Sequence, residues 1–138
     1  MSDFKVASRY AKSLIELANS NKELEEVHND VILIAEGLEG SREFCLLLAS
    51  PIVKHKKKKT IIKAIYDGKV NTLTMRFLEL LCDKSRESLL EAILKEFIKQ
   101  YNIIRGIQLA TITTTIPLST SIPSAMINAA IDIFCKSV

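Results

Sequence analysis

The sequence has 138 residues, a formal net charge of +3 and an isoelectric point of about 8.8. Hydrophobic residues make up 48% of the chain and charged residues 25%, which is typical of globular proteins and argues against disorder. A dedicated nucleic-acid-binding domain is usually more basic, and no apolar run approaches the roughly 18 residues of a membrane-spanning helix. The N-terminus lacks the charged and apolar regions of a signal peptide, so we expect a cytosolic start.

Apolar residues in the first third of the chain recur at steps of three and four, which predicts helices. The first helix is expected over residues 4–18. Ser20–Glu23 has the serine and glutamate spacing of a capping box, and a second helix is expected from there to just before Gly37. Ser41 can cap a short third helix.

The helical pattern continues well past the middle of the chain. A fourth helix follows from the lysine block at residues 54–59, and Asn71 or Thr72 can cap a fifth. Ser88–Glu91 repeats the capping-box spacing and leads into a sixth helix. Six helices joined by short loops predict a helical bundle over residues 1–105.

The pattern changes after the sixth helix. Residues 107–116 are dense in threonine and isoleucine, which predicts a β-strand, and a last helix is expected from Ser119 or Ser121 with Pro123 in its first turn. One strand and one helix cannot bury enough surface to fold alone. We therefore expect residues 106–138 to be an incomplete second domain. The expected fold class is mainly α, a six-helix N-terminal bundle followed by a truncated α/β C-terminal segment.

Catalytic and metal-binding constellations are missing from the sequence. Gly68 and Lys69 are followed by Val70, so they do not form a phosphate-binding loop. His28 and His55 lie on different predicted elements without a clustered carboxylate or thiol, which argues against a metal site or a nucleophile pair. The odd number of widely spaced cysteines predicts buried thiols at Cys45, Cys82 and Cys135. We expect no enzymatic activity, no cofactor, no metal and no nucleotide binding.

A dense basic block surrounds His55 and comprises Lys54, Lys56, Lys57, Lys58 and Lys59. Such a block can attract phosphate or an anionic membrane surface. We interpret it as the solvated start of a helix, because no aromatic residues interleave the lysines to stack nucleic-acid bases. A phosphate-binding role stays open, and a nucleic-acid-binding helical domain is kept as an alternative that salt-dependent DNA binding would reveal.

The order and spacing of several segments resemble the delta subunit of bacterial ATP synthases, the relative of the mitochondrial oligomycin-sensitivity-conferring protein. Residues 6–14 are similar to its entry helix, and residues 50–53 to its loop before the fourth helix. Residues 77–81, followed by Arg86, resemble its fifth helix and the next turn, and residues 106–119 its hinge and second-domain strand. The resemblance covers the whole chain. Family members continue beyond this last helix with more strands and a final helix.

The resemblance implies a non-catalytic stator subunit of the rotary proton-translocating ATP synthase. Such a subunit sits on the catalytic head of alpha and beta subunits and ties it to the peripheral stalk, so that the head does not turn with the rotor. The expected location is the cytoplasmic face of the bacterial inner membrane, without a span of its own. The b subunit of the stalk would bind through the missing C-terminal region. A helical adaptor for another protein's amphipathic helix is the alternative, but it leaves the predicted strand unexplained.

The resemblance also implies a groove between the first and fifth helices that receives the amphipathic N-terminal helix of an alpha subunit. Small residues would let the partner helix approach closely, and larger apolar ones would anchor it. Each of these residues has an alternative role in the core, because both helices must pack on their neighbours. The residues expected to line the groove are Ala7, Tyr10, Ala11, Ser13, Leu14 and Leu17 on the first helix and Thr74, Phe77, Leu80 and Leu81 on the fifth.

Overall fold

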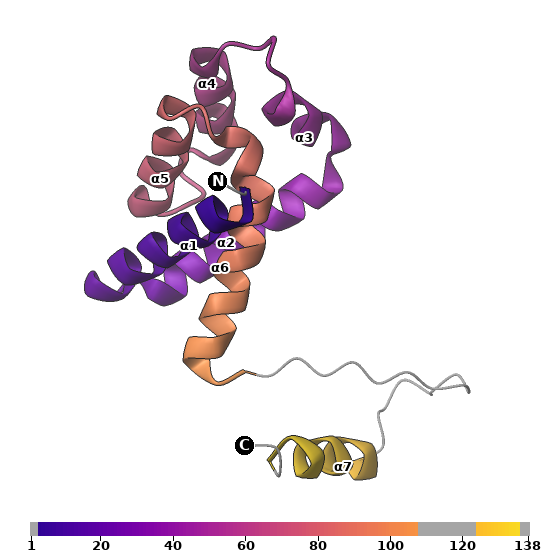
Figure 1. The fold of residues 1–138 in the computed structure, drawn as a ribbon. Coiled ribbons are helices and arrows are strands. Elements are labelled where there is room, and N and C mark those ends of the chain that lie inside the picture. The colour runs from indigo at the N-terminus through magenta and orange to yellow at the C-terminus, as the bar shows by residue number, and fades with distance from the viewer. Residues whose placement is uncertain (1–2, 108–123, 136–138) are drawn as a thin grey trace. The chain divides into compact units, whose positions relative to one another are not determined.

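The computed structural model describes residues 3–107 and 124–135 of the chain (Figure 1). It divides into two units, Met1–Gly106 and Ile107–Val138. All regular structure in the described residues is helical, which confirms the mainly α fold class. The first unit contains α1 (Asp3–Ser20), α2 (Leu24–Gly40), α3 (Arg42–Ala49), α4 (His55–Tyr66), α5 (Thr72–Asp83), the 3₁₀ turn η1 (Glu87–Leu89) and α6 (Leu90–Arg105), and the second contains α7 (Ser124–Cys135).

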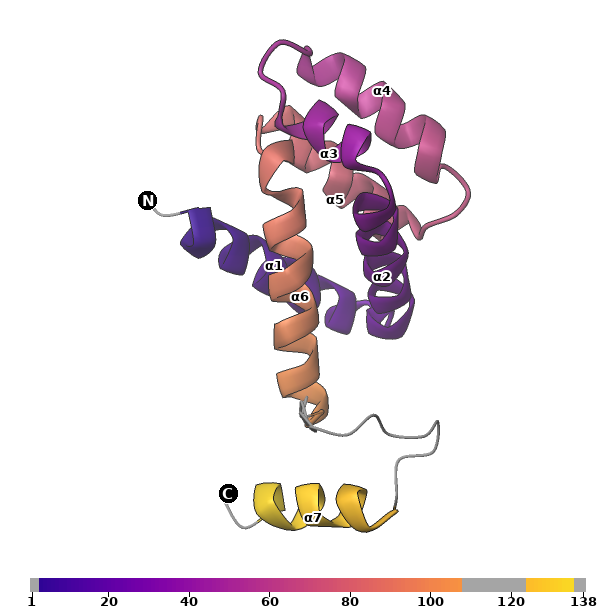
Figure 2. The ribbon, with the colours of Figure 1, turned by 90° about the vertical axis from the view of Figure 1, so that its right-hand side faces the viewer.

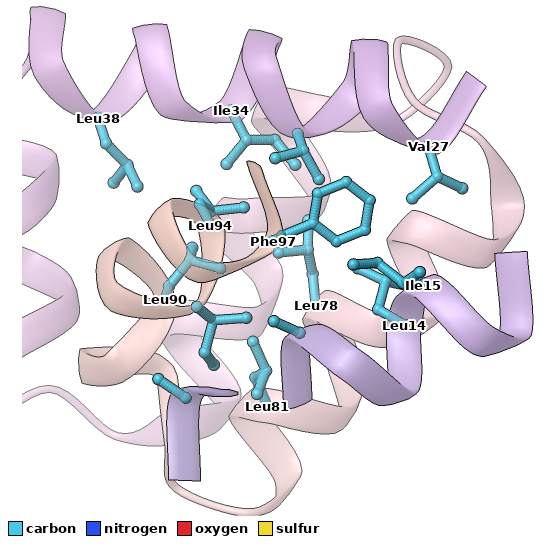
Figure 3. Packing of buried hydrophobic residues seen from close by; sticks show 14 of the residues in the cluster. Leu14, Ile15, Val27, Ile34, Leu38, Leu78, Leu81, Leu90, Leu94 and Phe97 are labelled. Carbon is cyan, nitrogen blue, oxygen red and sulfur yellow. The ribbon is translucent and has the colours of Figure 1, made fainter. Parts of the chain in front are cut away.

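Helix α6 is the centre of the first unit. Helices α1 and α2 both pack against it, and α4 packs along α5 (Figure 1, Figure 2). Phe97 of α6 is fully buried and lies among side chains of α1, α2 and α5, including Leu14, Ile34 and Leu78 (Figure 3). Burying such a side chain contributes roughly 1.5–3 kcal/mol to stability, so this cluster is the main source of the stability of the first unit.

Two of the predicted helix caps are confirmed and two are wrong. The side chains of Ser41 and Asn71 accept hydrogen bonds from the backbone at the starts of α3 and α5. The Ser20 hydroxyl instead bonds back to a carbonyl of α1, and no side-chain cap precedes α2. Lys22 adopts a left-handed conformation, and the backbone N–H groups of Lys22 and Glu23 donate to carbonyls at the end of α1, so a local turn takes the place of the predicted capping box. Ser88 lies inside the 3₁₀ turn and likewise does not cap α6.

The sequence predicted that the second helix ends just before Gly37. In the structure Gly37 lies within α2, which continues to Gly40. A Cβ atom added at this position would lie 2.8 Å from the hydroxyl oxygen of Tyr66 on α4. The glycine therefore makes room for the buried tyrosine, which is a packing role rather than the expected helix-terminating one.

The lysine block is divided by the fold, and its interpretation as wholly solvated is wrong. Lys58 is only 2% exposed, and its Nζ donates to Glu87 Oε1 and to the carbonyl of Leu48, each at 2.7 Å. Lys59 pairs with acidic side chains of α5. The remaining three lysines are exposed. Lys58 shares the inward face of α4 with Ile62 and Tyr66 at helical spacing, and this is the signal by which its burial could have been inferred.

The Glu87 carboxylate is stabilised in its ionised form. Burial raises its pKa, but the hydrogen bond from Lys58, a backbone hydrogen bond and the contact with His55 together lower the pKa below its ordinary value of 4.5. A carboxyl group with a lowered pKa in the folded state stabilises the fold above the unfolded-state pKa. That contribution is lost as the pH falls through the lowered pKa, so this site adds to acid sensitivity.

The predicted burial of the thiols is confirmed for Cys82 and holds only in part for Cys45. Cys82 is buried, and desolvation together with nearby acidic groups raises its pKa to about 11. Cys45 is half-buried, with its Sγ 3.2 Å from the Leu38 carbonyl, and the side chain of Cys135 lies outside the described residues. His28 stacks on Tyr101 at 3.8 Å between ring centroids, and burial lowers its pKa.

The expected strand at residues 107–116 falls almost entirely outside the described residues, as do the candidate caps Ser119 and Ser121. Helix α7 is described from Ser124 onward, and Pro123, expected in the first turn of the last helix, lies outside the described residues. Within the described ranges, no helix is long and apolar enough to cross a membrane.

Replacing Lys58 by Met is expected to lower the free energy of unfolding by about 3 kcal/mol, because the Glu87 carboxylate would remain buried without its ammonium partner. The measurement is urea denaturation at pH 7. Lys57→Met, at an exposed neighbour, serves as the control and should change stability by less than about 0.5 kcal/mol. Equal stability of the two variants would show that the buried pair does not hold α4 in place.

Candidate functional site

The ten predicted groove residues separate into core and surface. Five of them are buried: Ala7, Ala11, Leu14, Thr74 and Leu81. Thr74 donates to the carboxylate of Asp30 on α2 at 2.7 Å, so its hydroxyl ties α5 to α2. In the structure these five side chains are therefore part of the core and do not line an open groove.

The other five residues define what we call the α1/α5 face: Tyr10, Ser13, Leu17, Phe77 and Leu80. Tyr10 and Phe77 are half-buried and meet edge to face, with ring centroids 6.2 Å apart. Leu17 is 50% exposed and Leu80 is 43% exposed. The two rings are therefore the contact by which α1 and α5 meet at this surface, and the two leucines offer apolar area to solvent.

Ser13 adds little polarity to the α1/α5 face. Its hydroxyl donates to the carbonyl of Arg9 one turn earlier, at 2.9 Å. Tyr10 three residues before it and Leu17 four residues after it lie on the same side of α1, so the three residues form a stripe along the helix. A stripe with a small, internally satisfied residue between two larger ones suits the close approach of another helix.

Sequence reasoning did not assign a site role to Arg86, which the structure places beside this face. Its guanidinium carbon lies 5.5 Å from the centroid of the Tyr10 ring, and Nη1 donates to the Tyr10 hydroxyl at 3.4 Å. The two residues are 76 positions apart, so no local spacing could have paired them. The only signal was the presence of Arg86 in the segment that resembles the delta subunit.

His55 also has a partner that the sequence did not reveal. Its Nδ1 lies 2.9 Å from Glu87 Oε1, and its Nε2 lies 3.1 Å from the hydroxyl of Ser85. The expectation that His55 has no carboxylate beside it is therefore wrong, because the fold brings η1 to the start of α4.

The contacts of Ser85, His55 and Glu87 follow the order of a catalytic triad, but the surroundings do not provide for acyl transfer. Such chemistry needs free donors aimed at a developing oxyanion. The backbone N–H groups of Ser85 and Arg86 are already bonded to carbonyls of α5. The Glu87 oxygen that contacts His55 also accepts from Lys58. We interpret the cluster as a structural connection between α4 and η1. Among the described residues, this cluster included, no group of three or more histidine, cysteine or carboxylate side chains that could hold a metal ion occurs.

Comparison with known proteins identifies the family. The family model described as ATP synthase delta (OSCP) subunit matches residues 6–135. This chain belongs to the ATP synthase delta (OSCP) subunit family. The resemblance recognised in the sequence is thereby confirmed.

Curated relatives agree with this family. A protein named ATP synthase subunit delta from Cytophaga hutchinsonii is 39% identical over 86% of this chain and 65% of its own length. Its counterpart in Amoebophilus asiaticus is 35% identical over 99% of the chain and 75% of its own length. The chloroplastic ATP synthase subunit delta of Ochrosphaera neapolitana is 32% identical over 86% of the chain. The chain thus spans about two thirds of the length of these relatives, from 65% to 75%.

Two adjacent leucines of α5 test the division between core and surface. Leu81→Ala is expected to lower the free energy of unfolding by about 2–5 kcal/mol, because Leu81 is 1% exposed and its removal leaves a cavity. Leu80→Ala should cost less than about 1 kcal/mol, because Leu80 already faces solvent. Urea denaturation followed by circular dichroism measures both. Similar losses in the two variants would place Leu80 in the core and remove it from the α1/α5 face.

Proposed function

We propose that this chain acts as a non-catalytic stator subunit of a rotary, proton-translocating ATP synthase. The observation that carries the proposal is the family match over residues 6–135, and the names of the curated relatives support it. In this role the chain links the catalytic head of alpha and beta subunits to the peripheral stalk. It works at the membrane-associated complex, on the cytoplasmic side, and resists the torque that the rotor applies to the head.

The α1/α5 face is the proposed contact with the head. An amphipathic helix from the N-terminus of an alpha subunit would lie along α1 and α5 and cover Leu17 and Leu80. Each of these leucines is about half exposed, so covering them contributes roughly 1 kcal/mol apiece from apolar burial. The Tyr10 and Phe77 rings supply larger amphipathic anchors, the residue types that dominate binding energy at interfaces. The buried groove residues then act as the support beneath the contact.

A stator has to transmit force without deforming, and the packing of the first unit suits that requirement. The proposed contact lies on two helices whose inner faces join one buried cluster with α6. Close-packed cores transmit strain and have low compressibility. A helix held on the α1/α5 face would therefore be connected mechanically to the end of α6 at Arg105, where the second unit follows.

We further propose that residues 1–105 are a six-helix N-terminal domain and that residues 106–138 belong to a second, α/β domain. The left-handed Gly106, with φ of +67°, separates the two. In this scheme the second domain provides the contact with the b subunit of the peripheral stalk. In this arrangement the first domain would bind the catalytic head, and the second domain would bind the peripheral stalk.

A synthetic peptide copying the N-terminal helix of the cognate alpha subunit is expected to bind the chain through the α1/α5 face. Leu80→Asp should weaken this binding at least about 100-fold, because a charge would be desolvated in an apolar contact. Isothermal titration calorimetry measures the dissociation constants. Tyr10→Asp should have a similar effect.

Ile52→Asp is the matched control, because Ile52 is 90% exposed in the loop before α4 and lies on neither α1 nor α5. It should leave the affinity unchanged. A peptide with the same composition in scrambled order checks that an amphipathic pattern is required. Unchanged binding by a folded Leu80→Asp variant would contradict the proposed contact, and equal binding of unrelated amphipathic helices would favour a general adaptor.

Deletion of the residues after Arg105 is expected to leave the first unit folded, with a free energy of unfolding within about 1 kcal/mol of the full chain. The physical reason is that, among the described residues, the buried cluster comprises residues between Ala7 and Tyr101. Thermal denaturation of the shortened chain provides the measurement. Unfolding on deletion would mean that the tail completes the core and that the proposed domain boundary is wrong.

A further inference from the structure

Arg86 has unused binding capacity at the edge of the α1/α5 face. Its side chain is exposed, and within the described residues its guanidinium contacts only Tyr10, over the ring and at the hydroxyl. No ion pair of Arg86 is formed in this part of the chain. A guanidinium carries five N–H donors in a planar fork, so most of its donors remain available.

Both neighbours of Arg86 in the chain are held in place. Ser85 adopts a left-handed conformation, with φ of +56°, and its hydroxyl contacts His55. Glu87 is buried and bonded to Lys58. The backbone N–H of Arg86 itself donates to the Leu81 carbonyl at 2.9 Å. The backbone that carries the guanidinium is therefore preorganised, which lowers the entropy lost when the side chain binds a partner.

The acidic side chains nearest in sequence are committed to other partners. Asp83 pairs with Lys59, and Glu79 pairs with Lys59 and Lys63 on the α4 side of α5. Lys84, in the same turn as Arg86, adds a second exposed positive charge. The positive charge of Arg86 at this edge of the α1/α5 face is therefore not paired with a carboxylate of the described residues.

We propose that Arg86 is a specificity-determining residue of the α1/α5 face and that it selects a partner helix carrying an aspartate or glutamate beside its apolar anchors. The inference rests on the proposed function, because it assumes that a helix occupies this face. A guanidinium binds a carboxylate through two parallel hydrogen bonds, which fixes position and orientation as well as adding affinity. Apolar anchors alone tolerate a helix in several registers, whereas a single carboxylate pairing with Arg86 would fix one register and one direction.

The test is a double-mutant cycle between Arg86 and the acidic residues of the alpha-subunit peptide. Wild-type chain and Arg86→Ala are titrated with the native peptide and with versions in which each Asp or Glu is replaced in turn by the corresponding amide. Arg86→Ala should bind the native peptide about 10-fold more weakly, with a smaller dependence on salt concentration. One amide replacement should weaken wild-type binding similarly and have little further effect in Arg86→Ala.

Reversing the charge at both positions tests whether binding affinity can be restored. Arg86→Glu should bind the native peptide poorly and recover affinity when the identified acidic residue of the peptide is replaced by Lys. Arg42→Ala is the matched control, because Arg42 is an exposed arginine on α3 and its loss changes the net charge by the same amount. Circular dichroism checks that each variant is folded.

The outcomes separate this inference from the proposed function. If Leu80→Asp abolishes binding but Arg86→Ala matches the wild type in affinity and salt dependence, only the role of Arg86 is overturned. The same holds if no single acidic residue of the peptide is coupled to Arg86. If the wild-type chain does not bind the peptide at all, both the proposed contact and the role of Arg86 fail.

Discussion

The buried ion pair between Lys58 and Glu87 is the interaction on which the arrangement of the α3–η1 region depends. It joins the start of α4 to η1, and through the Leu48 carbonyl it also holds the end of α3. Removing two charges from water is costly, and the cost is offset only when their hydrogen bonds are well made. His55, also of α4, contacts the same carboxylate oxygen, so two side chains of α4 meet at Glu87 Oε1, and the Lys58 ammonium joins α3, α4 and η1.

This convergence has a consequence for the surface. Glu87 is buried and its neighbour Arg86 is exposed, so the ion pair that fixes Glu87 also restrains the backbone next to the guanidinium that contacts Tyr10. The core and the proposed contact surface are thus linked through adjacent residues of one turn. A substitution that destabilised η1 would therefore shift Arg86 at the edge of the α1/α5 face, although it changes no residue of that face.

The family and the division of α1 and α5 into inner and outer sides together make a mechanical role reasonable. Leu81 and Leu80 are neighbours in sequence, yet one lies in the cluster around Phe97 and the other faces solvent. A helix that contributes to a shared core on one side and to a contact surface on the other can pass force directly between them. The chemistry found near His55 does not compete with this interpretation, since its donors are already engaged within the fold.

Much of the architecture was predictable because helical periodicity and end signals are local properties. The mainly α class, the caps at Ser41 and Asn71 and the family itself all followed from the order of residues. Local patterns could not separate core from surface among the groove residues, because α1 and α5 carry apolar side chains on both the inner and the outer side.

Only the tertiary structure decided the long-range pairings. Lys58 meets Glu87 across 29 positions, and Arg86 meets Tyr10 across 76. A lysine in a basic run has the composition of a solvated helix start, and its burial depends on a carboxylate that another element supplies. The role of Gly37 was likewise set by Tyr66 of a different helix. The sequence by itself determined which segments are helical and which family they belong to, while packing determined which charges are buried and which side chains remain free to bind.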